Sequence, residues 1–150
     1  MAGTSTNAPF TKAFTNAALS AKAHHHKLSQ RQRAAIAVAF AYKHIGDWYR
    51  YGAMGPHRWD CSGLAGGAWK SAGIKIPRVT TSIYRHGYKR VSRAHLQPGD
   101  LLFFYHVGHV MIYVGSGYAI HAPHTGQRVK KIKLNKYEWR YFNGAVRPGA

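Results

Sequence analysis

The sequence predicts an α+β fold in which helices come first and a mostly antiparallel sheet follows. Residues 29–72 carry the helix signals, and from residue 99 onward short apolar runs alternate with turn residues. These runs are separated by only a few residues, which is typical of antiparallel strands and too short for crossover helices. With 150 residues, of which 45% are hydrophobic, the chain is long enough for one domain with a substantial core.

Residues 1–28 show little hydrophobic periodicity. We expect them to form a flexible leader or linker, and we expect residues 29–150 to form the folded domain. The three histidines at 24–26 fit a solvated linker better than a metal site. No basic segment followed by an apolar run is present, so we expect no signal peptide in this chain. The protein is therefore either intracellular or secreted after removal of a signal, and the sequence leaves both possibilities open.

The first helix is predicted to begin after Ser29. Ser29 and Gln32 fit a capping box, in which each side chain bonds the other residue's backbone N–H. Gly46 is a plausible stop for this helix. Three apolar residues fall near one face of it: Ile36, Phe40 and Ile45.

A second, shorter helix is predicted over residues 61–72, after an aromatic-rich loop at 46–60. Asp60 is its expected N-cap and Gly73 its expected C-cap. Three glycines lie within this helix: Gly63, Gly66 and Gly67. Because glycine is a poor helix former, we expect close packing against another element to compensate for them.

The strands are predicted after the turn at 98–100. Two apolar runs, at 109–114 and 118–121, are separated by Gly-Ser-Gly and form a β-hairpin. Further strands are expected at 101–105, 129–134 and 140–146.

Composition excludes several classes of enzyme. The chain has 22 Lys and Arg residues but only four Asp and Glu, which gives a net charge of +18. Four carboxylates are too few for an EF-hand or a two-metal hydrolase, and a glycosidase pair would use half of them. The single cysteine, Cys61, excludes an internal disulfide. Any chemistry should therefore depend on Cys, His, Tyr or Ser side chains.

Cys61, His109 and His121 form the candidate catalytic group. Cys61 lies in the predicted first turn of a helix, where unpaired amides and the helix dipole are expected to lower the thiol pKa. A thiolate nucleophile needs a base and an orienting group. The two histidines lie on the two arms of the predicted hairpin, so we expect them to be close together.

Zinc binding is an alternative for the same part of the chain, through two pairs of histidines: His106 with His109, and His121 with His124. Residues three apart on a strand point to opposite faces, so these pairs are poorly placed for one metal ion. We therefore expect no metal and no cofactor.

Four groups of residues resemble the NlpC-type cell-wall cysteine peptidases and occur in that family's order. They are GDWY (46–49) with WDCSGL (59–64), IPR (76–78), QPGDLLFF (97–104), and GHVMIYVG (108–115) with IHA (120–122). The resemblance covers roughly residues 30–146. Met111 and Ala53 stand where the family often has glycine, Tyr51 stands where tryptophan is frequent, and the family's glutamine is not evident near residues 80–84.

The resemblance implies a papain-like fold and hydrolysis of peptidoglycan stem peptides, most likely at the bond between D-γ-glutamate and the diamino acid. It makes Cys61 the nucleophile, His109 the base and His121 the orienting residue. It also implies four substrate-binding residues: Tyr49, Asp60, Ser62 and Arg78. An enzyme of this kind would act as a secreted or wall-bound protein, and we expect it to be a monomer without a membrane span.

Two basic groups fit an anionic partner. One contains Arg85, Lys89, Arg90 and Arg93, and the other contains Arg128, Lys130, Lys131, Lys133, Lys136 and Arg140. We expect peptidoglycan and other anionic wall polymers as partners. Nucleic acid is less expected, because no nucleic-acid-binding motif is present. Two alternatives stay open: an amidase or acyltransferase on the same scaffold, and a non-catalytic basic module that binds cell wall or nucleic acid.

Overall fold

The predicted capping box begins helix α3 (Gln30–Lys43) in the computed structural model, which describes residues 27–150. The Ser29 hydroxyl accepts from the Gln32 N–H, and the Gln32 side chain accepts from the Ser29 N–H. This prediction is confirmed. Of the expected leader at 1–28, only residues 27 and 28 are described; the three histidines at 24–26 lie outside the described residues.

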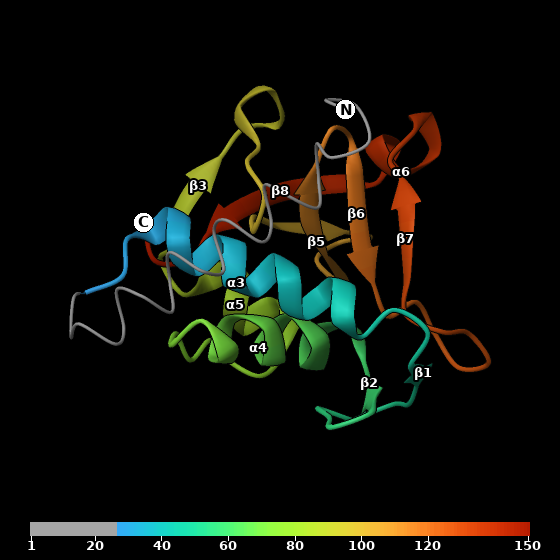
Figure 1. Cartoon of the computed structure of the whole chain (residues 1–150). Helices are drawn as coiled ribbons and strands as arrows, with labels where there is room; N and C mark the ends of the chain where they lie inside the picture. The colour runs from blue at the N-terminus through green and yellow to red at the C-terminus, as the bar shows by residue number, and fades with distance from the viewer. Residues whose placement is uncertain (1–26) are drawn as a thin grey trace, which may run out of the picture.

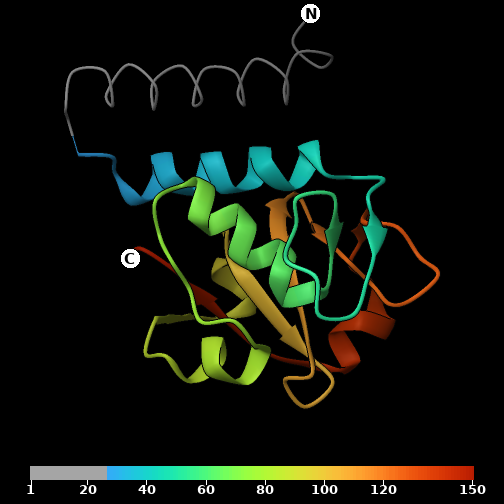
Figure 2. The same ribbon diagram turned by 90° about the horizontal axis from the view of Figure 1, so that it is seen from below.

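The buried face of α3 differs from the prediction because it is made of small side chains. Ile36 and Phe40 are only partly buried, and Ile45 lies beyond the helix and is 41% exposed. The helix ends at Lys43, three residues before Gly46. Its buried residues are Ala34, Ala37, Val38 and Ala41. Small residues allow α3 to pack closely against α4, and Figure 2 shows these two helices side by side.

Helix α4 (Cys61–Ser71) has the predicted N-cap, since the Asp60 carboxylate accepts from the Gly63 N–H at 2.7 Å. Its glycines permit close contacts, as predicted. A Cβ at Gly67 would lie 2.8 Å from the Trp59 ring and 3.1 Å from the Phe40 ring, whereas one at Gly66 would meet nothing within 4 Å. Packing therefore accounts for Gly67 and leaves Gly66 without a structural reason.

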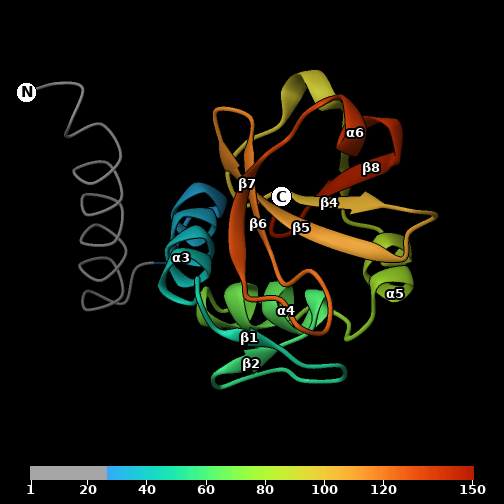
Figure 3. The same ribbon diagram turned by 90° about the vertical axis from the view of Figure 1, so that its right-hand side faces the viewer.

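Six antiparallel strands form the sheet, in the order β3-β8-β4-β5-β6-β7. They are β3 (Lys89–Val91), β4 (Leu101–Phe104), β5 (His109–Gly115), β6 (Tyr118–His121), β7 (Lys130–Lys133) and β8 (Phe142–Arg147). Helices α3 and α4 cover one face of this sheet (Figures 1 and 3). The predicted α+β class and the β5–β6 hairpin are confirmed.

Several short elements differ from the prediction. Residues 136–140 form helix α6 (Lys136–Arg140), in which Asn135 and Glu138 make a second capping box, so the strand expected at 140–146 begins only at Phe142. The aromatic loop contains two paired parallel strands, β1 (Trp48–Tyr49) and β2 (Arg58–Trp59). Helix α5 (Thr80–Arg85), strand β3 and the 3₁₀ turn η1 (Arg93–His95) had no clear sequence signal.

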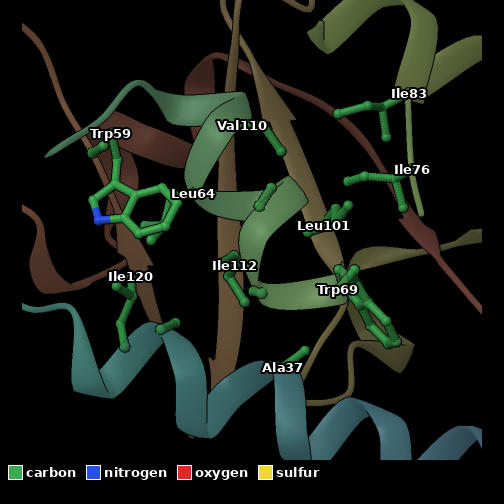
Figure 4. Packing of buried hydrophobic residues seen from close by; sticks show 14 of the residues in the cluster. Ala37, Trp59, Leu64, Trp69, Ile76, Ile83, Leu101, Val110, Ile112 and Ile120 are labelled. Carbon is green, nitrogen blue, oxygen red and sulfur yellow. The ribbon is translucent and has the colours of Figure 1, made fainter. Parts of the chain in front are cut away.

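The core lies on both faces of the sheet. Leu101 and Phe103 pack against the helices, as Figure 4 shows for Leu101, Trp69 and Ile112, while Leu102 and Phe104 pack in a second cluster on the other face. Burial on both faces explains why β4 reads as an unbroken apolar run. Within residues 27–150, every helix is too short or too polar to cross a membrane.

Candidate active site

Cys61 is the first residue of α4, at the end of the helix that faces strand β5. The side chain is partly buried against the main core cluster. The backbone amide of Val110 lies close enough to the Cys61 thiol to lower its pKa. Because Val110 follows His109 directly, the N-terminus of α4 lies close to the start of β5.

His109 and His121 are in direct contact, as the hairpin prediction required. The Nε2 of His109 lies 2.8 Å from the Nδ1 of His121, and the two rings are nearly perpendicular. Ile112 pairs with Ile120 across β5 and β6, so these two side chains lie on one face of the sheet. His109 is three residues from Ile112 and His121 is one residue from Ile120. Because side chains alternate along a strand, both histidines lie on the opposite face and therefore share it. They are diagonal neighbours on that face, and the imidazole rings span the gap.

A tight turn between β4 and β5 sets the position of His109. Tyr105, His106 and Val107 all have left-handed backbone conformations, with φ of 56°, 56° and 64°. Such conformations cost about 1–3 kcal/mol each in non-glycine residues and persist only where the surroundings hold them. The Val107 N–H donates to Oδ1 of Asn143 at 2.8 Å, so the last strand of the sheet holds this turn.

Burial keeps the candidate thiol and imidazoles in their neutral forms. Desolvation, with a smaller contribution from His124, lowers the pKa of His109 to about 4. Desolvation, followed by the nearby His109, Lys130 and His124, lowers the pKa of His121 to about 3. The pKa of the Cys61 thiol is raised, first by burial and then by the Asp60 carboxylate, although nearby backbone N–H groups partly oppose the rise. The predicted lowering of the thiol pKa is therefore wrong, because desolvation outweighs the amides of the helix start.

Asp60, Ser62 and Arg78 form one hydrogen-bonded cluster next to the thiol. The Arg78 guanidinium donates to Oδ1 and Oδ2 of Asp60 at 3.1 and 2.8 Å, and also to the Ser62 hydroxyl at 2.9 Å. The Gly52 N–H donates to the same carboxylate. The structure thus pairs Arg78 with a protein carboxylate, a contact that its spacing in the sequence does not reveal.

Tyr49, on β1, belongs to the same neighbourhood. Burial raises the pKa of its hydroxyl, and the charges of Cys61 and Asp60 raise it further, while Arg78 opposes them. These interactions place the phenol near both the thiol and the Asp60–Arg78 pair. All four predicted substrate-binding residues therefore lie around Cys61.

A further network, which the sequence did not reveal, supports the segment before Cys61. The Asp47 carboxylate accepts from Nε1 of Trp59 at 2.9 Å and contacts Nδ1 of His44 at 2.8 Å. Trp59 is 3% exposed and precedes the N-cap of α4. Asp47 and Trp59 belong to the GDWY and WDCSGL groups, but the sequence does not show that they are in contact, and His44 is the C-cap of α3.

The histidine pairs proposed for zinc do not assemble into a ligand set. Across residues 27–150, no three His, Cys, Asp or Glu side chains gather in an arrangement that could hold a metal ion. His124 instead contacts the Thr125 carbonyl through Nδ1, at 3.0 Å.

Comparison with known sequences places this site in a family. The NlpC/P60 family model matches residues 46–147. Murein DD-endopeptidase MepH from Escherichia coli is 36% identical over 141 residues, which are 88% of this chain and 52% of that protein. The probable endopeptidase p60 of Listeria seeligeri is 40% identical over 98 residues, which are 63% of this chain but 18% of that protein. This chain thus corresponds to part of each of these longer relatives.

Solved structures agree with the sequence match. An NlpC/P60 family protein from Bacillus cereus superposes with a TM-score of 0.73 at 32% identity, covering 78% of this chain and 40% of that chain. The helices packed on a mostly antiparallel sheet accordingly form the α+β, papain-like fold that the resemblance implied. The match over residues 46–147 and the agreement in fold show that this chain belongs to the NlpC/P60 family.

Proposed function

We propose that this domain is a peptidoglycan endopeptidase, a cysteine peptidase that cleaves an amide bond in the stem peptide. Cys61 is the nucleophile, His109 is the general base and His121 orients the base. The observation that carries the proposal is the 2.8 Å contact between the two imidazoles, one of which begins β5, the strand that α4 with Cys61 at its N-terminus contacts. The names of the E. coli and Listeria relatives support the same activity.

Proton transfer in this arrangement requires particular tautomers. The Nε2 of His109 contacts His121, so its Nδ1 is the nitrogen left to accept the thiol proton. Nε2 of His109 then carries the hydrogen and donates to Nδ1 of His121. This bond becomes charge-assisted when His109 is protonated, and so it favours the charged state that forms during attack.

The reaction begins from a neutral pair. Because burial keeps His109 unprotonated and raises the thiol pKa, the thiol proton moves to His109 as the sulfur attacks the amide carbon. The developing oxyanion is stabilised by the Cys61 N–H, which lies among the unpaired amides of the first turn of α4. His109 then protonates the leaving amine, and water hydrolyses the acyl-enzyme.

The cluster around Asp60 is the proposed binding site for the polar end of the stem peptide. Asp60 and Arg78 neutralise each other, so they offer donors and acceptors without a large net charge. Arg78 is 36% exposed at its side chain, and this leaves part of the guanidinium for a substrate carboxylate. Tyr49 and Ser62 complete the group. We propose that the domain acts at the cell wall as a monomer.

Mass spectrometry of digested peptidoglycan tests the activity and identifies the bond. Purified sacculi are incubated with the protein and with its Cys61→Ala variant. Fragments that appear only with the intact thiol support the proposal, and fragment masses distinguish the D-γ-glutamyl–diamino acid bond, which we favour, from the D,D bond named for the E. coli relative. Release of intact stem peptides would instead indicate an amidase. Absence of any release from several wall chemistries would contradict the proposal.

A further inference from the structure

The turn at residues 105–108, which leads into β5, has a conformation that its own sequence disfavours. A backbone hydrogen bond of 3.0 Å from the Gly108 N–H to the Tyr105 carbonyl closes this β-turn. Its two central residues, His106 and Val107, both have positive φ, a geometry that usually requires Asn, Asp or Gly. Val107 is β-branched, and a β-branched residue rarely adopts such a φ. Contacts from outside the turn must therefore hold it in place.

One side chain supplies such a contact. The Val107 N–H donates to Oδ1 of Asn143 at 2.8 Å, and within the described part of the chain no other side chain hydrogen-bonds the backbone of this turn. The Tyr105 N–H donates to the carbonyl of Tyr141, the residue just before β8. Because Val107 lies only two residues before His109, a movement of the turn would also move the candidate base.

A β-bulge in β8 directs the Asn143 side chain toward the turn. Two successive residues of β4 pair with Gly144 and with Phe142, which leaves Asn143 as an extra residue without a partner on β4. A bulge changes the direction of a side chain relative to a regular ladder, and bulges are common next to active sites. The amide of Asn143 is thereby able to reach the turn beyond the end of β4.

The bulge is itself held by helix α5. The Tyr84 hydroxyl donates to the Asn143 carbonyl at 3.1 Å, and the Tyr84 ring packs against Phe103 with the ring centroids 5.1 Å apart. A Cβ at Gly144 would lie 2.8 Å from the Tyr84 hydroxyl, so glycine at this position lets the tyrosine approach. The position of Asn143 is thus set by contacts within the protein and does not depend on a substrate.

We propose that Asn143 is a positioning residue for the reaction, because it fixes the turn and so keeps the His109 imidazole aligned with Cys61 and His121. This inference rests on the function proposed above. A small displacement of a base from its nucleophile slows the chemical step without a matching loss of substrate binding. The bond to Val107 is exposed, so water can partly replace it, and we expect kcat to depend on it by about three- to tenfold.

Three variants test this role with a soluble muropeptide that digestion of sacculi identifies as a substrate. Asn143→Ala removes the acceptor for the Val107 N–H, whereas Asn143→Asp retains an oxygen at the same position. Ser29→Ala is the matched control, because it also removes an exposed side-chain acceptor of a backbone N–H, at the start of α3. The opposite end of α3 is the one that contacts Trp59, two residues before Cys61.

We expect Asn143→Ala to lower kcat about three- to tenfold and to leave KM within about twofold of the wild-type value. Asn143→Asp should restore most of kcat, and Ser29→Ala should lower Tm without changing kcat. A wild-type kcat in Asn143→Ala, a change confined to KM, or equal losses in the alanine and aspartate variants would overturn the inference.

Nuclear magnetic resonance separates this role from the proposed function. In Asn143→Ala, hydrogen exchange of the Val107 amide should accelerate about threefold or more and the imidazole resonances of His109 should shift, with smaller changes in Asn143→Asp and none in Ser29→Ala. If the wild-type protein cleaved no muropeptide, the proposed function would fail, and these spectra would still decide whether Asn143 fixes the imidazole. Unchanged spectra in Asn143→Ala would overturn the inference whatever the activity.

Discussion

Replacement of His121 tests the proposed mechanism most directly, because two substitutions separate hydrogen bonding from ring chemistry. His121→Ala removes the acceptor for the Nε2–H of His109. His121→Asn retains an acceptor, the side-chain oxygen, and removes the imidazole. If His121 only orients the base, then asparagine should restore much of the activity that alanine loses.

The expected size of the effect follows from the contact. The two nitrogens are 2.8 Å apart in a partly buried site, and the bond becomes charge-assisted when His109 takes the thiol proton. Hydrogen bonds to charged groups contribute about 1.5–3 kcal/mol, which corresponds to a loss in kcat/KM of about 10- to 150-fold for His121→Ala. His121→Asn should lose about tenfold or less.

The assay is release of a soluble stem-peptide fragment, with Cys61→Ala as the baseline and thermal unfolding as the check on folding. The pH profile adds a second readout. Because the pKa of His109 is about 4, the base stays neutral above this pH, and kcat/KM should fall as the pH drops through about 4. Wild-type activity in His121→Ala, or equal losses in the alanine and asparagine variants, would refute the orienting role.

Three further predictions concern the thiol and the packing. Because the pKa of the Cys61 thiol is raised, the fraction of reactive thiolate should still be growing at pH 9. The rate constant for alkylation by iodoacetamide should therefore increase about tenfold per pH unit up to pH 9, and a plateau in this rate below pH 8 would contradict the raised pKa. Gly67→Ala should destabilise the fold by about 1–3 kcal/mol, because the new methyl group would collide with the aromatic rings packed there. Gly66→Ala should instead stabilise the fold by up to about 1 kcal/mol, because a methyl group at this position meets nothing. Urea unfolding measures both free energies, and equal effects of the two substitutions would contradict this explanation. Arg147→Met should cost about 3–5 kcal/mol by leaving Asp100 buried and unpaired, and addition of Asp100→Asn should recover part of the loss in the same measurement.

Local signals in the sequence predicted the framework of the fold well. Ser29 and Asp60 begin helices because their side chains satisfy backbone N–H groups within three residues, so the information is local. The proximity of His109 and His121 also followed from a short hairpin, in which the register is fixed by the turn.

Features that depend on distant packing could not be predicted in this way. The alanine face of α3 is buried because α4 approaches it, and no periodicity in α3 alone reveals that approach. The pKa of Cys61 depends on how deeply the folded chain buries the thiol, which a helix position does not determine. The pairing of Arg78 with Asp60 joins residues 18 positions apart and needs the loop between them to be placed.

The position of β8 has a consequence for the order in which the domain becomes functional during synthesis. Although it is the last strand along the chain, β8 lies between β3 and β4 in the sheet, and its Asn143 holds the turn before His109. Until the ribosome has released β8, the sheet has a gap and the left-handed turn lacks its support. We therefore expect the arrangement of Cys61 and His109 to become fixed only after β8 has joined the sheet.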